Sequence, residues 1–253
     1  MVALLHTEGL CRDFGGIHAV KDVSLEFTGG SIHAVIGPNG AGKTTLINLL
    51  SGDITPTRGR IFLQGSDITG AQPQQIARRG VGRSYQQTHV INDMTCMENC
   101  RLGAQTLHSG SNAFAGMGFL RPASAYDDVN TFAEDALGRV GLLDRANVLA
   151  TNLSHGERRQ LEIGMVLAAG PSLILLDEPL AGMGVGDSRR MIDLLKELSQ
   201  TRTIILIEHD MDAVFELADV LTVMVDGEVL KTGAPAIIRA DPMVQKAYLG
   251  EPV

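Results

Sequence analysis

The residues Gly37 to Thr44 read G-P-N-G-A-G-K-T and fit the pattern G-x-x-x-x-G-K-[ST] at every fixed position. Glycines let consecutive backbone N–H groups turn inward without a Cβ in the way, and a following helix adds partial positive charge. A flexible turn would need neither the lysine nor the threonine, so the stretch predicts a nucleotide triphosphate site. The predicted nucleotide-binding residues here are Gly37, Pro38, Asn39, Gly40, Ala41, Gly42, Lys43 and Thr44.

An acidic pair stands at the end of a second apolar stretch, "SLILLD", where Asp177 is followed by Glu178. An acid at the carboxyl end of a parallel strand beside a phosphate loop is placed to hold Mg²⁺, and the hydroxyl of Thr44 can reach the same ion. Glu178 can then orient and deprotonate a water. Alone, such a pair is often a solvated turn. Beside the loop it indicates phosphoryl transfer.

The flanking patterns predict the elements that position these residues. "SIHAVIG" before the loop is a strand pattern and "KTTLINLL" after it is helical. "SLILLD" and "TIILIE" are apolar runs typical of strands buried on both faces of a parallel sheet. Asp226-Gly227 between two apolar runs indicates a hairpin, and residues 189–198 a helix. From about residue 88 to 167 helical patterns dominate, so we expect an α/β core interrupted by a helical insert.

Composition bounds the class of protein. The chain has 253 residues, of which 44% are hydrophobic and 20% charged, and a formal net charge of −8. That acidic balance argues against broad nucleic-acid contact and against adsorption to anionic lipid. The three cysteines, Cys11, Cys96 and Cys100, form no disulfide framework and are too few for a structural zinc. We expect small buried thiols.

No stretch of the sequence predicts a membrane span, since the longest uncharged run, residues 102–120, carries many polar residues and glycines. The start, "MVALLHTEGL", lacks the basic region and the apolar length of a signal peptide. We therefore expect a cytoplasmic chain.

A further segment, "NLSHGERRQLEIG", opens a predicted helix. Ser154 and Glu157 have the spacing of a capping box. In one interpretation, Ser154 has no role beyond capping that helix. The same Ser-x-Gly opening can also present a hydroxyl, N–H groups and the helix dipole to a phosphate. That phosphate could lie in the loop of a second chain.

With these segments in place, the sequence resembles the ATP-binding subunits of ABC transporters over nearly its whole length. "LSHGE" is similar to the family signature L-S-G-G-Q and departs from it at His155 and Glu157. Gln86 in "GRSYQQ" corresponds to the glutamine that senses Mg²⁺ and the γ-phosphate, and His209 in "LIEHDM" to the switch histidine. Phe14 corresponds to the aromatic residue that stacks on adenine. Gly184 stands where the family usually has an Asp.

The resemblance implies an α/β fold: a P-loop NTPase (RecA-like) core with an N-terminal antiparallel β subdomain and an inserted α-helical subdomain. It implies one ABC-type ATP-binding domain over 1–253, with core segments 1–87 and 168–230, a helical subdomain 88–167 and a short C-terminal tail 231–253.

The resemblance also implies ATP and Mg²⁺ as ligands and an ATPase activity. Thr45 would reach the α-phosphate, and Thr44, Gln86 and Asp177 would organise Mg²⁺. Glu178, His209 and Gln86 would be the catalytic residues. Across a dimer, the signature of one chain would close on the ATP of the other through Ser154, Gly156 and Glu157.

Several segments, including "DFGGIHAV", "RSYQQ", "EPLAGM" and "KAYLGE", are similar to the branch that imports branched-chain (hydrophobic) amino acids, urea and short amides. The implied partners are a second ATP-binding subunit (the same chain or a paralogue), two transmembrane permease subunits and, indirectly, an extracytoplasmic solute-binding protein. The chain would then lie on the inner face of the cell membrane.

Alternatives remain at this point. A urea or short-amide importer shares the branch, and a non-transport ABC-type ATPase of DNA repair or cofactor assembly shares the signature. A P-loop small-molecule kinase shares only the phosphate loop. Residues 108–130 are either a mobile surface excursion or a partner contact.

Overall fold

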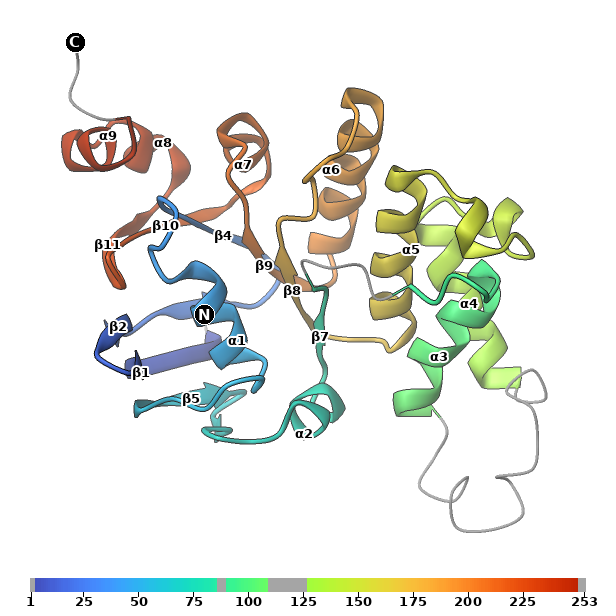
Figure 1. Cartoon of the computed structure of the whole chain (residues 1–253), viewed down its shortest axis with the longest axis horizontal. Helices are drawn as coiled ribbons and strands as arrows, with labels where there is room; N and C mark the ends of the chain where they lie inside the picture. Colours follow the sequence, from blue (N-terminus) through green and yellow to red (C-terminus); the bar gives the residue numbers. More distant parts are fainter. Residues whose placement is uncertain (1–2, 86–89, 109–126, 250–253) are drawn as a thin grey trace. The chain divides into compact units, whose positions relative to one another are not determined.

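The structure is a computed structural model that describes residues 3–85, 90–108 and 127–249 (Figure 1). It divides into two compact units. The first comprises the chain up to residue 79, residues 175–178 and residues from 195 onward, and the second comprises residues 80–174 and 179–194. Most of the predicted excursion at 108–130 lies outside the described residues.

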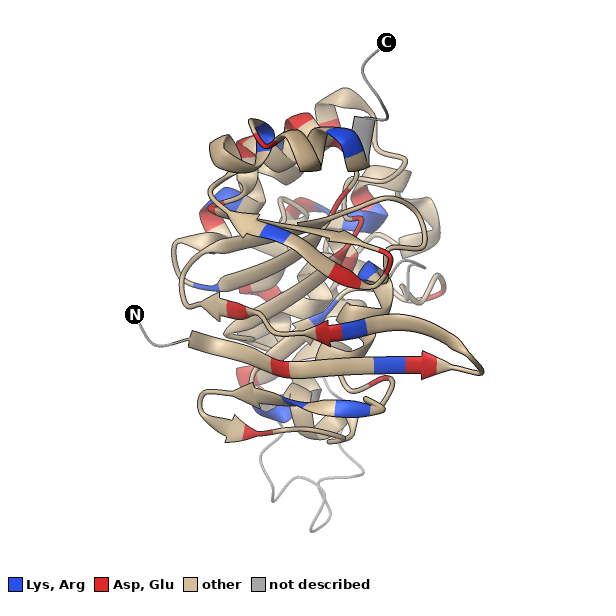
Figure 2. Cartoon of the chain, turned by 90° about the vertical axis from the view of Figure 1, so that its left-hand side faces the viewer, with Lys and Arg blue, Asp and Glu red and all other residues tan. Residues whose placement is uncertain are grey.

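The N-terminal part of the first unit is an antiparallel sheet in the order β2-β1-β5-β6, with β3 paired to β1. Charged residues of both signs are interspersed along β1 (Figure 2). This sheet confirms the predicted N-terminal β subdomain. Its strands are β1 (Ala3–Phe14), β2 (Ile17–Val23), β3 (Glu26–Thr28), β5 (Arg58–Leu63) and β6 (Ser66–Asp67).

The second sheet of this unit runs in the order β11-β10-β4-β9-β8. β4 lies parallel to both β10 and β9, so a strand from the first part of the chain joins strands from the last part. β4, β8 and β9 are buried at every residue, as the apolar runs predict. The strands are β4 (Ile32–Ile36), β8 (Leu173–Asp177), β9 (Thr203–Ile207), β10 (Val220–Val225) and β11 (Glu228–Gly233).

The predicted hairpin joins β10 and β11 antiparallel. Its two turn residues, Asp226 and Gly227, have φ values of 49° and 86°. Both positive values are those of a type I′ turn, which explains the Asp-Gly pair.

Helices cover the sheets of the first unit. α1 (Lys43–Leu50) lies between the two sheets (Figure 1) and buries Leu46, Ile47, Leu49 and Leu50. A core cluster joins β4 and β10 to the C-terminal helices through buried Val214, Ile238 and Val244. These helices are α7 (Met211–Leu217), α8 (Pro235–Arg239) and α9 (Pro242–Leu249), and the unit also contains α2 (Pro73–Arg78).

In its described residues, the second unit is built on three helices that pack together, as the helical patterns predict. Gly103 marks a close approach of α3 to α5, because a Cβ there would lie 2.1 Å from the Met165 carbonyl oxygen. The helices are α3 (Cys96–His108), α4 (Asp127–Arg139) and α5 (His155–Ala168), with the 3-10 turns η3 (Leu143–Arg145) and η4 (Ala150–Asn152). β7 (Val81–Arg83) and the first part of α6 (Val185–Ser199) also belong here.

A capping box forms at the start of α3. The Thr95 backbone N–H donates to Glu98 Oε2 over 2.8 Å, and the Glu98 N–H donates to Thr95 Oγ1 over 3.2 Å. The three cysteines are free and buried, and burial raises the pKa of the Cys100 thiol to about 12. They are the small buried thiols that the sequence predicts.

A buried histidine in β4 links stability to pH. His33 is 4% exposed, and its Nε2 accepts a 3.0 Å hydrogen bond from the Thr28 backbone N–H. Burial lowers the pKa of His33, with the charge of Asp219 opposing. The unfolded chain therefore binds the proton first as the pH falls through the ordinary histidine range, near 6.5, and the native state loses stability there.

We expect the free energy of unfolding to fall between about pH 7.5 and pH 5.5 more steeply in the wild type than in His33→Gln. Glutamine offers an acceptor near the position of Nε2 but does not titrate. One proton sets an upper limit of about 1.4 kcal/mol per pH unit on the difference in slope. Urea unfolding at a series of pH values measures both slopes, and equal slopes would contradict the prediction.

Candidate functional site

The glycine loop leaves the sheet at the end of β4 and leads directly into α1. β4 ends at Ile36 and α1 begins at Lys43, with Gly42 as the N-cap residue. Gly40 and Gly42 have φ values of 82° and 94°, in the left-handed region that favours glycine. The first N–H groups of α1 have no partners within the helix and lie at this loop, so the loop is built to receive an anion.

Backbone carbonyl groups of β10 and β2 lie close to two glycines of the loop. A Cβ on Gly37 would lie 2.1 Å from the Met224 carbonyl oxygen, and one on Gly42 would lie 2.2 Å from the Ala19 carbonyl oxygen. Real Cβ atoms do not approach carbonyl oxygens so closely. The glycines therefore serve packing against β10 and β2 as well as the turn.

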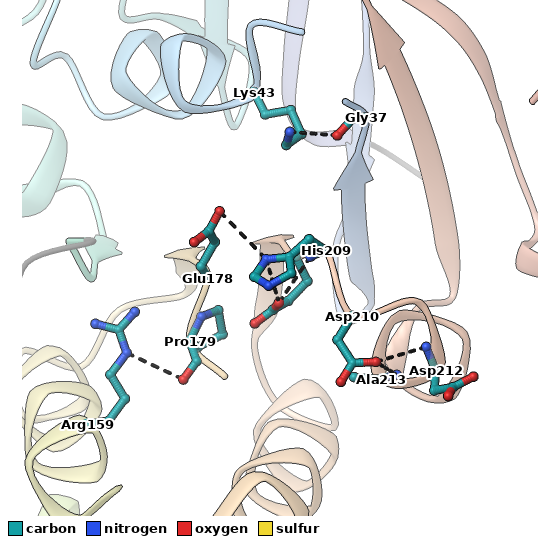
Figure 3. A network of polar contacts seen from close by, with 10 residues as sticks. Gly37, Lys43, Arg159, Glu178, Pro179, His209, Asp210, Asp212 and Ala213 are labelled. Carbon is teal, nitrogen blue, oxygen red and sulfur yellow. Dashed lines mark hydrogen bonds and ion pairs between the residues drawn. The ribbon is translucent and has the colours of Figure 1, made fainter. Parts of the chain in front are cut away.

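The side chain of Lys43 is held by hydrogen bonds to the start of the loop. Its Nζ donates to the carbonyl oxygens of Gly37, over 2.8 Å, and of Pro38, over 3.1 Å. Burial lowers the pKa of Lys43, and the charges of Glu178 and Asp177 act in the opposite direction. The charges of both predicted acids thus act on the ammonium group. Figure 3 shows the Glu178 carboxylate directed toward Lys43.

The acidic pair ends β8 as predicted. Asp177 is 2% exposed, whereas Glu178 points into the open site. Glu178 has a φ of 51°, and its backbone N–H donates to the Ile207 carbonyl over 2.9 Å. A left-handed conformation costs a residue with a side chain about 1–2 kcal/mol, and such residues gather at functional sites because the surrounding structure holds them there.

His209 follows β9 and faces the same opening. Its Nδ1 lies 3.8 Å from Glu178 Oε1 and 3.9 Å from Glu208 Oε2 (Figure 3). Glu208 is 1% exposed and accepts a 3.1 Å hydrogen bond from the His209 backbone N–H. Asp210 then caps α7 by accepting from the N–H groups of Asp212 and Ala213.

These groups surround one cavity of about 490 Å³ within the first unit. It combines loop backbone, one ammonium group, one carboxylate and one imidazole, a set that suits a chain of phosphates and an attacking water. Its lining residues are Gly37, Pro38, Asn39, Lys43, Glu178 and His209.

The donors suited to Mg²⁺ are the hydroxyl of Thr44 and the buried carboxylate of Asp177. Among the described residues, no group of three or more His, Cys, Asp or Glu side chains could hold a metal ion. A site of one hydroxyl and one carboxylate fits Mg²⁺, which keeps waters and phosphate oxygens as its other ligands. Thr45 lies in the first turn of α1, and the predicted third ligand, Gln86, falls outside the described residues.

Phe14 ends β1 at a two-residue turn made by Gly15 and Gly16. The Phe14 side chain is 43% exposed, and the Arg12 guanidinium carbon lies 4.5 Å from its ring centroid. Arg12 is itself tied to the Thr55 carbonyl over 2.9 Å. One face of the ring is therefore covered by a cation, and a base would stack on the other face.

The signature residues belong to the second unit. Ser154 caps α5: its Oγ accepts from the Glu157 N–H over 3.2 Å, and its own N–H donates to Glu157 Oε2 over 2.8 Å. The Ser154 N–H holds the pKa of Glu157 below its usual range, with Arg145 contributing. The capping role is thus real, and Ser154 Oγ is the acceptor in it.

Gly156 and Gly184 differ in their surroundings. A Cβ on Gly156 would lie 2.4 Å from Asp187 Oδ2, whereas one on Gly184 would meet nothing within 4 Å. Gly156 is therefore needed for close packing against the start of α6. Gly184 has room for the side chain that the family usually carries there.

Sequence reasoning missed Glu208, Arg12 and a buried ion pair on α5. Glu208 stands in the apolar run "TIILIE" and could have been recognised as a buried acid beside the predicted histidine. Arg12 lies two residues before Phe14 in β1. The ion pair is formed by Arg159 and Glu162, which have the helical spacing i, i+3.

None of the helices in the described parts of the chain is long and apolar enough to cross a membrane.

Comparison with known proteins shows the family of the chain. The family model described as ABC transporter matches residues 20–181. The chain is 41% identical over 255 aligned positions to the high-affinity branched-chain amino acid transport ATP-binding protein LivG of Escherichia coli (strain K12), with 98% of each chain covered. It is 39% identical to BraF of Pseudomonas aeruginosa, which bears the same description, again with 98% of each covered.

Among solved structures, a nucleotide-free ATP-binding cassette from an ABC transporter matches with a TM-score of 0.86 at 29% identity, covering 99% of this chain and 100% of the other. The ADP conformation of an ATP-binding cassette matches with the same score and coverage. These likenesses confirm the predicted fold class.

We predict that Gly42→Ala destabilises the protein more than Gly40→Ala. Both glycines are left-handed, a conformation that costs alanine about 1–2 kcal/mol, but only at Gly42 would the new Cβ collide with backbone. We expect an additional loss of about 1–3 kcal/mol for Gly42→Ala. Urea unfolding of the two variants measures the difference, and equal losses would mean that the Ala19 contact is not constraining.

Proposed function

Because this chain belongs to the ABC transporter family, we propose that it is the ATP-hydrolysing subunit of an importer for branched-chain amino acids. The observation that supports the ATPase chemistry is the convergence of Lys43, Glu178 and His209 on one cavity. The support for the solute class is the 41% identity to a branched-chain amino acid transport protein over nearly the whole of both chains.

The loop and Lys43 would bind ATP. Backbone N–H groups from Gly40 to Thr44 and the ammonium of Lys43 face the β- and γ-phosphates, and Thr45 reaches the α-phosphate. Phe14 supplies the stacking surface for adenine. Lys43 now donates to two loop carbonyls, so its ammonium already lies in the loop that would receive the phosphates.

Glu178 would act on water and His209 on the transferred phosphoryl group. The Glu178 carboxylate can orient a water and accept its proton, which is the role of a general base. His209 lies 3.8 Å from that carboxylate and can donate to the charge that develops on the phosphoryl oxygens. The buried Glu208 fixes the backbone of His209 from behind.

Mg²⁺ would be held by Thr44, Asp177 and, outside the described residues, Gln86. When bound, the ion neutralises charge on the phosphates and orients them. Asp177 can serve this purpose because its carboxylate is fixed in a buried position at the strand end.

A second subunit would complete each site. The hydroxyl of Ser154, the N–H groups around Gly156, and Glu157 would close on the γ-phosphate of the partner's ATP. Solved cassettes of the family include a dimer bound to ADP and phosphate, at 22% identity to this chain. We therefore propose that the chain pairs with a copy of itself or a paralogue on two permease subunits, at the inner face of the membrane, supplied by a solute-binding protein.

We also propose that the chain divides into working parts at the predicted segment boundaries. Residues 1–87 and 168–230 would form the nucleotide-binding core, 88–167 the helical subdomain and 231–253 a short tail. Closure on ATP would bring the helical subdomains together and move the permease.

Lys43→Ala should abolish tight ATP binding by the purified chain, because the loop loses its only side-chain cation among the cavity residues. ATP-driven uptake of labelled leucine into membrane vesicles carrying the complete transporter should be lost with it. Calorimetric titration and vesicle uptake measure the two effects.

The matched control is Lys196→Ala, which removes an exposed lysine paired with Glu216. It should bind ATP and support uptake like the wild type. Unchanged ATP affinity in Lys43→Ala would remove the phosphate loop from the proposal. Uptake of labelled urea in place of leucine would assign the urea and amide branch, and ATP hydrolysis without uptake of either would favour a non-transport ATPase.

Glu178→Gln should bind ATP while its turnover falls by about a hundredfold or more, the usual contribution of a general base. The exposed Glu197→Gln is the control and should hydrolyse ATP normally. Light scattering on a sizing column, with ATP and Mg²⁺, then tests assembly of the trapped variant. A dimer means that two copies can complete both sites. A monomer that binds ATP means that another subunit supplies the second half, and normal turnover would remove Glu178 as the base.

A further inference from the structure

A buried ion pair lies on α5, and neither of its residues is among those that line the cavity already described. Arg159 Nη1 and Glu162 Oε2 are 2.6 Å apart, and the two side chains are 6% and 5% exposed. Their helix neighbours Leu161 and Ile163 are buried and apolar. The pair therefore lies in a buried part of α5.

Burying two charges is costly, and the mutual attraction of such a pair offsets the desolvation only when further hydrogen bonds satisfy both groups. Apolar residues of similar volume often stabilise a fold as well or better. A pair retained in this position is therefore expected to fix a geometry rather than to add stability.

The further hydrogen bonds of the pair reach two other segments of the second unit. Glu162 Oε1 accepts from the Tyr85 backbone N–H over 3.1 Å, and Arg159 Nη1 donates to the Tyr85 carbonyl over 3.0 Å. Both backbone groups of Tyr85 are thus held by one pair. Arg159 Nε also donates to the Pro179 carbonyl over 3.4 Å, as Figure 3 shows.

Both segments adjoin proposed site residues. Pro179 follows Glu178, and because proline has no N–H, its carbonyl is its only backbone hydrogen-bonding group. Glu178 itself is held at a φ of 51°, so its carboxylate direction depends on how the chain is fixed on either side. Before it, the Glu178 N–H is bonded to Ile207, and after it, the Pro179 carbonyl is bonded to Arg159.

We propose that Arg159 and Glu162 form a positioning pair that fixes the Pro179 carbonyl and so the orientation of the Glu178 carboxylate. Neither residue reaches the phosphates in this role. The pair joins the helix that begins at Ser154 to the residue that follows the base, so a displacement of α5 is transmitted to Glu178 through one arginine. This inference rests on the proposed function of Glu178.

The test is the double variant Arg159→Met/Glu162→Gln. It removes both charges together, so no buried charge is left without its counter-ion, and the glutamine introduced in place of Glu162 keeps an acceptor for the Tyr85 N–H. The methionine introduced in place of Arg159 has no N–H at the position of Nε, so the Pro179 carbonyl loses its donor. We expect kcat for ATP to fall at least about tenfold, with ATP affinity within about twofold of the wild type and Tm within about 4 °C.

The matched control is Arg139→Gln/Asp135→Asn. This pair lies on α4 of the same unit, at 2.8 Å, with side chains 36% and 57% exposed. Because exposed pairs contribute little, the control should keep the kcat, ATP affinity and Tm of the wild type. A second variant, Arg159→Lys, keeps the charge beside Glu162 but loses the planar fork, and should show the same fall in kcat.

A fall in kcat without a change in ATP affinity distinguishes a positioning role from a folding defect. A purely structural pair would lower activity only in proportion to the unfolded fraction, which circular dichroism measures on the same samples. Wild-type kcat in the folded double variant would overturn the inference. If the double variant does not fold, Arg159→Lys decides in the same way. Failure of the proposed function gives a different result, because ATP hydrolysis would then be absent in the wild type or turnover would be normal in Glu178→Gln.

Discussion

Strand β4 hydrogen-bonds in parallel to β10 on one side and to β9 on the other, and this pairing sets where the glycine loop must leave the sheet. The same pairing brings the ends of neighbouring strands to one edge, so Lys43 after β4 and His209 after β9 face the same cavity. Met224 of β10 then limits the loop from the other side through its carbonyl oxygen. The chemistry of the first unit is therefore a consequence of strand order, and the buried apolar residues of three strands secure it.

Much of this arrangement could be predicted from the sequence, because the signals are local. The glycine loop, the Asp226-Gly227 hairpin and the Ser154 capping box each depend on residues a few positions apart, and each forms as expected. The apolar runs of β8 and β9 are equally local, since strands buried on both faces need no alternation. The resemblance to a known family then supplied the roles proposed for Phe14 and His209.

The remainder could not be predicted because it depends on contacts between distant segments. No pattern in "LLDEP" indicates that Glu178 adopts a left-handed conformation, which follows from its bond to Ile207 on another strand. The ion pair on α5 is visible as two charges three residues apart, but an exposed pair such as Arg139 and Asp135 has a similar spacing. Only burial distinguishes them, and burial is set by the packing of the helices.

The stacking of Arg12 on Phe14 has a consequence for selectivity. A base placed on the open face of Phe14 would form the third layer of a stack whose first layer is the guanidinium and whose second is the phenyl ring. Such a stack recognises flatness and polarisable area, and it offers no donor or acceptor to the edge of the base. Adenine and guanine present similar flat faces. In its proposed role Phe14 would therefore accept either purine, and discrimination between them would have to come from groups at the rim of the stack.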